Sequence, residues 1–369
     1  MSGAPLIALA AGGTGGHMFP AEALAQELKR RGARVLLVTD ARGARYAQNF
    51  PADERFEISA ANPNAPGPVA KALAALVMAK GLMTALSEFK KRGVAAAVGF
   101  GGYPSLPSMK AAELLRIPYG LHEQNGVLGR SNRLLAGGAA FTAHAFPVLE
   151  RAPAKARLNE VGNPVRDAVA ALAGAPYPAD DATIRLLIFG GSQGASLFSK
   201  VSPKAVAALP ETLRGRLAVT HQVRDEDAAS VRAAYEAAGV TAELAPFFSD
   251  LPARIAASHL VIGRAGASTV TELAVIGRPS ILVPLAIAMD DHQTGNARVL
   301  ADAGAAVIIA EGDFTEQTLQ EKLAPLLAES GALAAMAAKA KGRVKEGASA
   351  ALAGLVLDLA DRNAARKAA

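Results

Sequence analysis

Three glycine-rich segments contain the residues best suited to chemistry, and each follows a short apolar run. The segments are Gly12–His17 (GGTGGH), Gly99–Ser105 (GFGGYPS) and Gly190–Ala195 (GGSQGA). Glycine lets backbone N–H groups approach an anion closely, and the dipole of a following helix adds favourable charge. Each segment alone is equally typical of a tight turn, and none has the Gly-Lys-Ser/Thr ending of a Walker A motif. Three in the same position after a strand predict a site that handles several phosphates.

A fourth segment, Gly263–Glu272 (GRAGASTVTE), follows the apolar run Leu260–Ile262 and is predicted to enter a helix. Its Gly266-Ala267-Ser268 backbone suits a diphosphate at the helix start. Glu272 follows within the same helix, where its carboxylate could accept the two hydroxyls of a ribose. The alternative for Glu272 is a helix-capping role.

The run Asp290-Asp291-His292-Gln293 follows another apolar stretch, with Asn296 just beyond it. Two acids and a histidine could suggest a metal, but no other segment supplies matching ligands. We therefore expect no metal and no cofactor, and we assign Gln293 to recognition of sugar hydroxyls.

Further polar residues occupy positions typical of an α/β site. His17 is a candidate general base or a neutral donor to phosphate, although a lone histidine is more often structural. His122-Glu123-Gln124-Asn125 follows the apolar stretch Ile117–Leu121, so Asn125 could bond a sugar hydroxyl or phosphate, or the run is a polar turn. Arg166 suits phosphate because guanidinium is a fork-shaped donor, and a surface ion pair is its alternative.

The elements that must position these residues alternate apolar strands with amphipathic helices. Leu6–Ala10, Val35–Val38 and Ala95–Gly99 are predicted strands, and Ala21–Arg31 is a predicted helix after Pro20. This βαβ pattern predicts a parallel sheet covered by helices. The pattern restarts at Arg185–Phe189. The later predicted strands are Leu217–Thr220, Leu260–Ile262, Ser280–Val283 and Ala306–Ile309.

The expected architecture is therefore an α/β fold with two Rossmann-like domains separated by a cleft. We expect the first domain at residues 1–162 and the second at residues 163–344. The helical tail, from about residue 345 to residue 369, could pack back on the first domain. Ligands of such sheets bind beyond the carboxyl ends of the strands.

Composition narrows the function. The 369 residues are 51% hydrophobic and 20% charged, which is typical of a globular protein. The chain has no cysteine, so disulfides and thiolate chemistry are excluded. The net charge of +6 suits phosphorylated or anionic partners, while an aromatic content of 5% without an RNA-binding motif argues against nucleic acid. No signal peptide or transmembrane helix is predicted.

The segment Val69–Arg92 is predicted as a helix, apart from Gly81, with apolar residues on two nearly opposite faces. One face carries Leu73, Leu76, Val77 and Met83. The other carries Met78, Leu82, Leu86 and Phe89. Basic residues surround the helix, and we expect the second face to lie on an anionic bilayer. Burial of both faces and a dimer contact are the alternatives.

Taken together, the motifs resemble those of the MurG family of glycosyltransferases. They span most of the chain in the family's order: GGTGGH (12–17), GFGGYPS (99–105), HEQN (122–125), GNPVR (162–166), GGSQGA (190–195), GRAGASTVTE (263–272) and DHQTGNA (291–297). The resemblance implies a GT-B fold, in which residues 1–162 form the acceptor- and membrane-associating domain and residues 163–344 form the UDP-sugar-binding domain. It also implies an inverting, metal-independent transfer of N-acetylglucosamine from UDP-N-acetylglucosamine. The acceptor is the C4 hydroxyl of the N-acetylmuramoyl group of lipid I, and the products of this step of peptidoglycan synthesis are lipid II and UDP.

The resemblance also implies roles for individual residues. The donor contacts are Thr14, Gly15, Gly16, Asn125, Arg166, Ser192, Phe248, Gly266, Ala267, Ser268, Glu272 and Gln293. The acceptor pyrophosphate contacts are Gly13, His17, Gly101, Gly102 and Tyr103, and His17 is also the candidate base. The family implies a peripheral location on the cytoplasmic face of the bacterial inner membrane and, as partners, other cell-wall synthesis proteins. The segment Val69–Arg92, which matches the family's membrane-associating patch, lacks the tryptophans that some members have there.

Three other functions fit part of the pattern. A UDP-N-acetylglucosamine epimerase shares the two-domain fold but leaves the basic and apolar helix unexplained. A dinucleotide-dependent oxidoreductase requires an acid after the second strand, and Asp40 lies there. A non-catalytic nucleotide-sugar sensor would not need His17.

Overall fold

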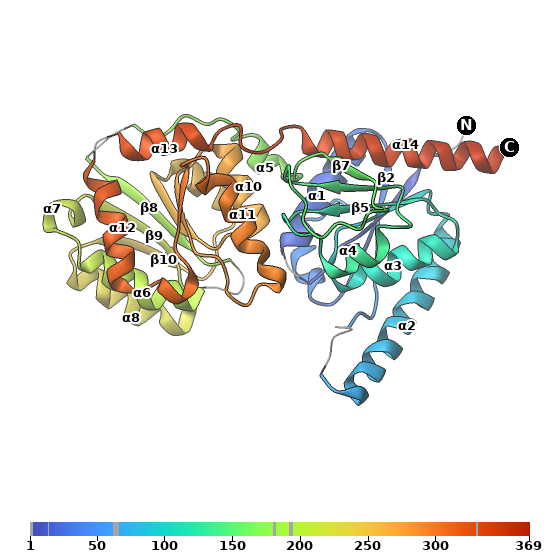
Figure 1. Cartoon of the computed structure of the whole chain (residues 1–369), viewed down its shortest axis with the longest axis horizontal. Coiled ribbons are helices and arrows are strands. Elements are labelled where there is room, and N and C mark those ends of the chain that lie inside the picture. The colour runs from blue at the N-terminus through green and yellow to red at the C-terminus, as the bar shows by residue number, and fades with distance from the viewer. Residues whose placement is uncertain (1–2, 14, 62–65, 180–181, 192–194, 330) are drawn as a thin grey trace. The chain divides into compact units, whose positions relative to one another are not determined.

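The computed structural model divides the chain into two compact units, which are described separately (Figure 1). Unit 1 comprises Met1–Asp167 and Lys345–Ala369, and unit 2 comprises Ala168–Val344. The structure describes residues 3–13, 15–61, 66–179, 182–191, 195–329 and 331–369. The first boundary therefore falls at Asp167 rather than at residue 162.

Unit 1 is built on a parallel sheet that has seven strands within the described residues. Across the sheet the order is β3 (Glu54–Glu57), β2 (Arg34–Thr39), β1 (Leu6–Ala10), β4 (Ala96–Gly99), β5 (Tyr119–Glu123), β6 (Phe141–His144) and β7 (Leu158–Glu160). The helices are α1 (Gly15–Arg30), α2 (Pro68–Arg92), α3 (Gly102–Leu114), α4 (Arg130–Leu135) and α14 (Ala348–Ala368), with the short 3₁₀ helix η1 (Gly43–Tyr46).

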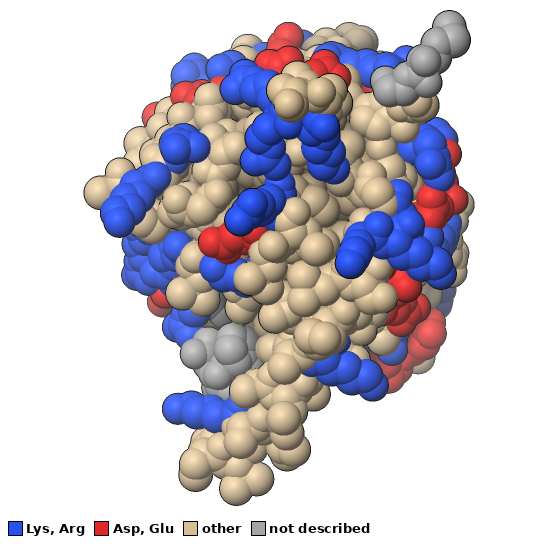
Figure 2. Space-filling view, turned by 90° about the vertical axis from the view of Figure 1, so that its right-hand side faces the viewer, with Lys and Arg blue, Asp and Glu red and all other residues tan. Residues whose placement is uncertain are grey.

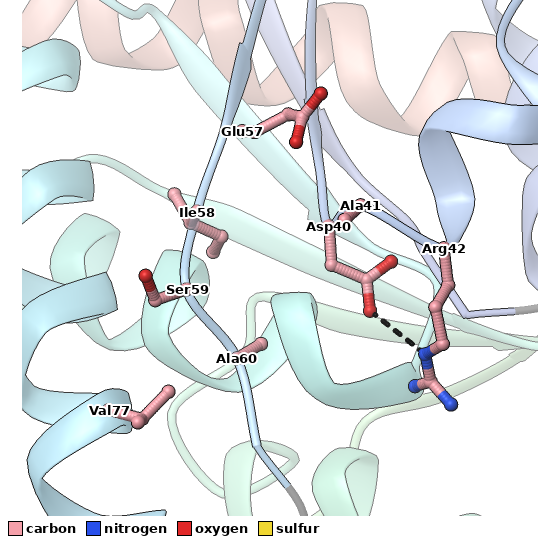
Figure 3. Close-up of a pocket in the computed structure, with 8 residues that line it drawn as sticks. All are labelled: Asp40, Ala41, Arg42, Glu57, Ile58, Ser59, Ala60 and Val77. Carbon is pink, nitrogen blue, oxygen red and sulfur yellow. Dashed lines mark ion pairs between the residues drawn. The ribbon is translucent and has the colours of Figure 1, made fainter.

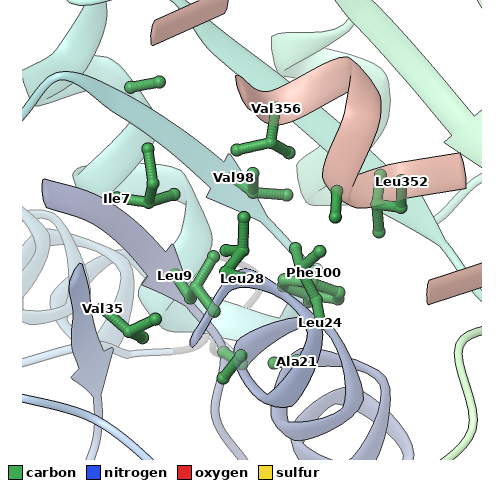
Figure 4. Close-up of a cluster of buried hydrophobic side chains, with 14 of the residues drawn as sticks. Ile7, Leu9, Ala21, Leu24, Leu28, Val35, Val98, Phe100, Leu352 and Val356 are labelled. Carbon is green, nitrogen blue, oxygen red and sulfur yellow. The ribbon is translucent and has the colours of Figure 1, made fainter. Parts of the chain in front are cut away.

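Helices cover both faces of this sheet. Since side chains alternate along each strand, successive residues of a central strand are buried on opposite faces. Ile7 and Leu9 of β1 lie in a core with residues of α1 and α14 (Figure 4). Leu6 and Ala8 point to the opposite face, where they join a core that includes residues of α2 and α3. A central strand buried on both faces needs an uninterrupted apolar sequence, and LIALA supplies it.

Helix α14 belongs to unit 1 although it follows unit 2 in the sequence. Leu352 and Val356 are fully buried among side chains that include Leu24 and Leu28 of α1 (Figure 4). The predicted helical tail is interrupted before α14, because Gly342 and Gly347 adopt positive φ angles of 72° and 70°. Left-handed residues end a helix.

Unit 2 contains a parallel sheet with six strands within the described residues. Its order is β10 (Thr241–Ala245), β9 (Leu217–Gln222), β8 (Ile184–Phe189), β11 (Leu260–Gly263), β12 (Ser280–Leu282) and β13 (Ala306–Ile308). Its helices are α6 (Ala195–Ala207), α7 (Glu211–Arg214), α8 (Asp225–Ala237), α9 (Leu251–Ala257), α10 (Ala267–Ile276), α11 (His292–Ala301), α12 (Glu316–Ala328) and α13 (Ala332–Ala340). The short helix α5 (Asp167–Ala170) spans the boundary, and the 3₁₀ helices η2 (Met289–Asp291) and η3 (Glu311–Asp313) complete the list.

The two sheets share one topology, and this sets where ligands bind. In unit 1 the order reverses between β1 and β4, and in unit 2 between β8 and β11. Crevices at the carboxyl ends of such strands are the ligand sites of doubly wound sheets. The four glycine-containing segments singled out in the sequence all follow these four strands.

Candidate active site

The loop after β1 is shaped by a buried carboxylate. Oδ1 of Asp40 accepts hydrogen bonds from the backbone N–H groups of Gly13, at 2.9 Å, and of Gly43, at 2.8 Å. A Cβ atom on Gly12 would lie 2.6 Å from Oδ1 of Asp40 and 2.6 Å from Cγ of Pro104, so only glycine fits there. Gly13 has a φ angle of +82°, and α1 begins two residues later. The predicted helix start at Ala21 was therefore wrong, and Pro20 lies inside α1.

This use of Asp40 bears on the oxidoreductase alternative. A ribose-binding acid must present its carboxylate to a cofactor, whereas Asp40 is 6% exposed and holds two backbone N–H groups. Its other oxygen lies 3.5 Å from Nε of Arg42. The acid at this position therefore serves the loop itself.

His17, in the first turn of α1, is held in one tautomer. Its Nδ1 lies 2.8 Å from the carbonyl oxygen of Phe100 and 2.7 Å from Nε2 of Gln124. The carbonyl only accepts, so Nδ1 must carry the proton. Rotating the Gln124 amide by 180° brings its Oε1 to the same N–H, and as placed this Oε1 is buried without a partner among the described residues. Nε2 of His17 is then the acceptor nitrogen, as a general base requires.

The second glycine loop packs directly on this imidazole. A Cβ atom on Gly101 would lie 3.1 Å from Cε1 of His17, and one on Gly102 would lie 3.4 Å from Cδ2. Both glycines have positive φ angles, of 85° and 74°. Tyr103 follows in α3, with Cζ of Arg42 5.4 Å from the centre of its ring. The structure thus brings together the residues predicted to hold the acceptor pyrophosphate: Gly13, His17, Gly101, Gly102 and Tyr103.

The polar run after β5 is organised by Glu123, whose importance the sequence did not reveal. Its Oε1 accepts from the backbone and side-chain N–H groups of Asn125, at 3.1 and 3.0 Å. Its Oε2 accepts from the backbone of Gly129 and from Nδ2 of Asn132, both at 2.9 Å. The side chain of Asn125 is therefore fixed by a buried carboxylate. The only sequence signal was an acid at the end of an apolar strand.

His122 is fully buried beside this run and is neutral. Burial lowers its pKa to about 4, although its hydrogen bond to the carbonyl of Gly162 opposes the shift. Its role is structural, because it has no access to substrate.

Arg166 lies beside the first glycine loop, because it stacks on Phe19, whose Cε2 would be 2.8 Å from a Cβ atom on Gly15. Its Cζ is 4.1 Å from the centre of the Phe19 ring. Burial raises the pKa of nearby Glu22, and the charge of Arg166 opposes this rise. Gly15 and Gly16 open α1, and Thr14 lies outside the described residues.

The start of α10 has the geometry of an anion-binding helix N-terminus. Gly266 precedes the helix and has no side chain to cap it, so the first N–H groups are left for a ligand. Ala267 is the first helical residue. Oγ of Ser268 is buried and has no hydrogen-bond partner in the described part of the chain. Nδ2 of Asn296 donates to the carbonyl of Ala265 at 3.2 Å and so fixes the loop.

The other residues predicted to contact the donor lie on separate segments of unit 2. Gln293 uses its Oε1 to accept from the backbone of Leu285 at 3.0 Å, and Glu272 is 6% exposed within α10. The ring of Phe248 is buried under the guanidinium of Arg254, whose Cζ lies 4.3 Å from the ring centre. Ser192 lies outside the described residues.

No metal site is found in the part of the chain that the structure describes, since no group of three or more His, Asp or Glu side chains converges there. Asp291 accepts instead from Oγ1 of Thr294 at 2.7 Å.

Helix α2 exposes the face opposite to the one predicted. Phe89 is fully buried, Leu82 and Leu86 pack against the same core, and Met78 is half-buried. The large apolar side chains that α2 exposes are Val69, Leu73, Leu76 and Met83, whose exposed fractions are 72%, 59%, 67% and 65%. The predicted membrane face was therefore wrong, because Leu82, Leu86 and Phe89 pack into the core of unit 1. By length and composition alone α2 could span a membrane, yet Ala74, Gly81, Ala85 and Phe89 are buried against unit 1.

Two family models match the chain. Residues 7–143 match the glycosyltransferase family 28 N-terminal domain, and residues 185–351 match the family 28 C-terminal domain. The first match ends within β6 and so leaves out β7, while the second spans β8 to β13, and each includes the glycine segments of its unit.

Curated relatives match over nearly the whole chain. A protein of Caulobacter vibrioides (strain NA1000 / CB15N) is 51% identical over 353 residues, covering 95% of this chain and 98% of its own. One of Methylobacterium nodulans is 50% identical over 362 residues, covering 96% and 97%. Both are named UDP-N-acetylglucosamine–N-acetylmuramyl-(pentapeptide) pyrophosphoryl-undecaprenol N-acetylglucosamine transferase.

Solved structures agree. The crystal structure of Acinetobacter baumannii MurG is 32% identical, with a TM-score of 0.76, and the match covers 96% of this chain and 99% of that one. The glycosyltransferase of kitacinnamycin has a TM-score of 0.72 at 16% identity and speaks for the fold alone. The expected GT-B fold with two Rossmann-like domains is confirmed.

Proposed function

The chain belongs to the MurG family within glycosyltransferase family 28, and from that premise we propose that it transfers N-acetylglucosamine from UDP-N-acetylglucosamine to lipid I. The products are lipid II and UDP. The observation that carries the proposal is 51% identity over 95% of the chain to a relative named for this reaction.

In the proposed mechanism His17 acts as the base. The C4 hydroxyl of the acceptor's N-acetylmuramoyl group attacks the anomeric carbon of the donor sugar, and its proton passes to Nε2 of His17. The bond from the anomeric carbon to the diphosphate breaks, and UDP leaves with the electron pair. Attack opposite the leaving group inverts the anomeric centre. A positioned base contributes roughly 10²–10⁴-fold to such a step.

Backbone dipoles supply the charge stabilisation. In this proposal the uncapped N–H groups of α10 and the hydroxyl of Ser268 bind the donor diphosphate, whose negative charge grows as UDP departs. The two glycine loops around His17 bind the acceptor diphosphate. No step of this proposal requires a metal ion or cofactor.

We further propose that the protein attaches peripherally to the cytoplasmic face of the bacterial inner membrane through α2. In Figure 1 this helix extends away from the rest of unit 1, and Figure 2 shows the projecting surface as mostly uncharged with basic side chains beside it. Lys71 and Lys80 are exposed on the same helix as the apolar residues. An apolar helix face flanked by lysines binds the interface of an anionic bilayer. Contacts with other cell-wall synthesis proteins are part of the same proposal.

Acceptor-dependent release of UDP is the decisive test. The protein is incubated with UDP-N-acetylglucosamine, with and without a lipid I analogue, and UDP is measured. We expect release only with the acceptor, together with a β-linked disaccharide product seen by NMR, because the α-linked donor is inverted. Release of UDP without acceptor, as an epimerase could give, or no release at all, would reject the proposal.

A further inference from the structure

An open pocket of about 440 Å³ lies at the carboxyl ends of β2 and β3, and the mechanism above does not use it (Figure 3). Its lining includes Asp40, Arg42, Glu57, Ile58, Ala60 and Val77. Val77 comes from α2, while the others follow or end the two strands. The pocket adjoins the first glycine loop, because Asp40 also holds the backbone of Gly13.

The guanidinium of Arg42 is the positive charge of this pocket, and its direction is set. Oδ2 of Asp40 lies 3.5 Å from Nε of Arg42 (Figure 3), so the carboxylate engages only one edge of the fork. The far end reaches the loop, where a terminal nitrogen (Nη2) lies 3.4 Å from the position of a Cβ atom on Gly13. Tyr103 flanks the guanidinium from the second glycine loop. Arg42 thus presents N–H groups beside both loops.

One wall of the pocket is apolar, although Glu57 and Ser59 also belong to the lining. Ile58 and Ala60 follow β3, and Val77 faces them from α2 (Figure 3). The two segments touch closely at Gly81, where a Cβ atom would lie 2.3 Å from the carbonyl oxygen of Ser59. On α2, Leu73 lies one turn before Val77 on the same face and is exposed. The wall therefore leads from a cation to the apolar face of α2.

We propose that this pocket binds the prenyl end of a polyprenyl diphosphate. Arg42 pairs with the phosphate that bears the lipid, since guanidinium matches phosphate in charge and geometry. The first isoprene units lie against Ile58, Ala60 and Val77. Asp40 is a positioning residue, because it aims Arg42 and shapes the loop. The inference rests on the proposed function, in which the acceptor is a polyprenyl diphosphate.

Direct titration of the full-length protein with geranyl diphosphate tests the pocket without any transfer reaction. We expect Arg42→Ala to raise the Kd at least about tenfold, the value of one charge-assisted contact. Arg45→Ala is the matched control, because Arg45 is also exposed and lies on η1 but does not line the pocket. Equal effects of the two substitutions, or no effect of either, would overturn the proposal.

Inorganic pyrophosphate separates the two ends of the pocket. Val77→Ser should raise the Kd for geranyl diphosphate and leave the Kd for pyrophosphate unchanged, while Arg42→Ala should raise both Kd values. Glu57→Gln should lower the Kd for both probes, since it removes a carboxylate from the pocket lining. If geranyl diphosphate and pyrophosphate bind wild-type protein equally, the apolar wall plays no part and the proposal is wrong.

Kinetics then place the pocket on the acceptor side. Arg42→Ala should raise the KM for a prenylated lipid I analogue at least about tenfold and leave the KM for UDP-N-acetylglucosamine unchanged. Arg42→Lys should restore part of the loss. A rise in the donor KM alone would contradict the assignment. If wild-type protein transfers no sugar, the proposed function fails, and the geranyl diphosphate titration still decides the pocket.

Discussion

Nδ1 of His17 lies 2.8 Å from the carbonyl oxygen of Phe100, and this contact decides which imidazole nitrogen can take a proton. His17→Ala should lower kcat by roughly 10²–10⁴-fold, because the acceptor hydroxyl loses its base. The Kd for UDP-N-acetylglucosamine, measured by calorimetry, should stay within about twofold, as expected when a group acts only in the transition state. A variant that chiefly loses donor affinity would show that His17 is a binding residue.

The orphan hydroxyl of Ser268 makes a prediction about the donor. Ser268→Ala should raise the Kd for UDP by roughly 2–10-fold, the value of one hydrogen bond. Ser202→Ala is a matched control, because its Oγ is also buried without a partner among the described residues of unit 2 but lies in α6. Both variants should fold, since neither hydroxyl holds another group in place. Equal Kd values for both variants would remove Ser268 from the donor site.

The exposed face of α2 predicts vesicle binding. Leu73→Ser with Leu76→Ser should weaken binding to vesicles that contain anionic lipid by at least about tenfold, since each leucine buried is worth about 1.5–3 kcal/mol. Phe247→Ser with Ile287→Ser is the control, because both side chains are exposed, at 72% and 86%, but lie in unit 2. The affinity of the Leu73→Ser/Leu76→Ser variant for UDP should equal that of the wild type. Vesicle binding that survives the α2 substitutions would reject this attachment site.

Two buried histidines predict how stability depends on pH. Burial lowers the pKa of His122 to about 4 and that of His221 to about 3, from an ordinary value of 6.5. At a pH between the lowered pKa values and 6.5, the unfolded chain binds more protons than the folded one. The free energy of unfolding is therefore highest above about pH 6.5 and falls as the pH drops towards 4. By about pH 4 each histidine therefore contributes a loss of about 3 kcal/mol.

The measurement is the unfolding temperature across pH 7 to 4.5, compared between wild type and His221→Phe. The wild type should lose more stability on acidification than the variant, which has no proton to take up at this position. Nδ1 of His221 shares a hydrogen bond of 3.0 Å with the hydroxyl of Tyr235. Because the variant loses this bond, its unfolding temperature at pH 7 should be lower than that of the wild type. Parallel curves for the two proteins would contradict the prediction.

The central strand β1 could be predicted from the sequence, and so could the edge strand β13, but the edge strands β3, β7 and β10 could not. β1 is all apolar and matches its predicted range, because a strand buried on both faces needs such a run. β3, β7 and β10 have the mixed sequences ERFE, LNE and TAELA and lie at sheet edges, where one side is open to solvent. Their position depends on hydrogen bonds to a neighbouring strand, which no local pattern reveals.

The candidate site was predictable by residue type but not by partner. The glycines and His17 stood out because of their spacing after strands. The roles of Asp40 and Glu123 did not, because each depends on backbone N–H groups that folding brings near. The exposed face of α2 was misjudged for a related reason: two apolar faces of one helix differ only in what packs against them.

Helix α14 gives unit 1 a particular history during synthesis. Unit 2 is an insertion within unit 1, so Leu352 and Val356 leave the ribosome only after the whole of unit 2. The nascent first unit therefore waits for its last core residues with an apolar surface uncovered, and a premature stop codon near the end of the gene would damage the part made first. The chain leaves unit 1 after Asp167 and returns at Lys345, and Gly162, shortly before the exit, lies against Lys345. Joining Gly162 to Lys345 through a short linker should yield a first unit that folds without the second.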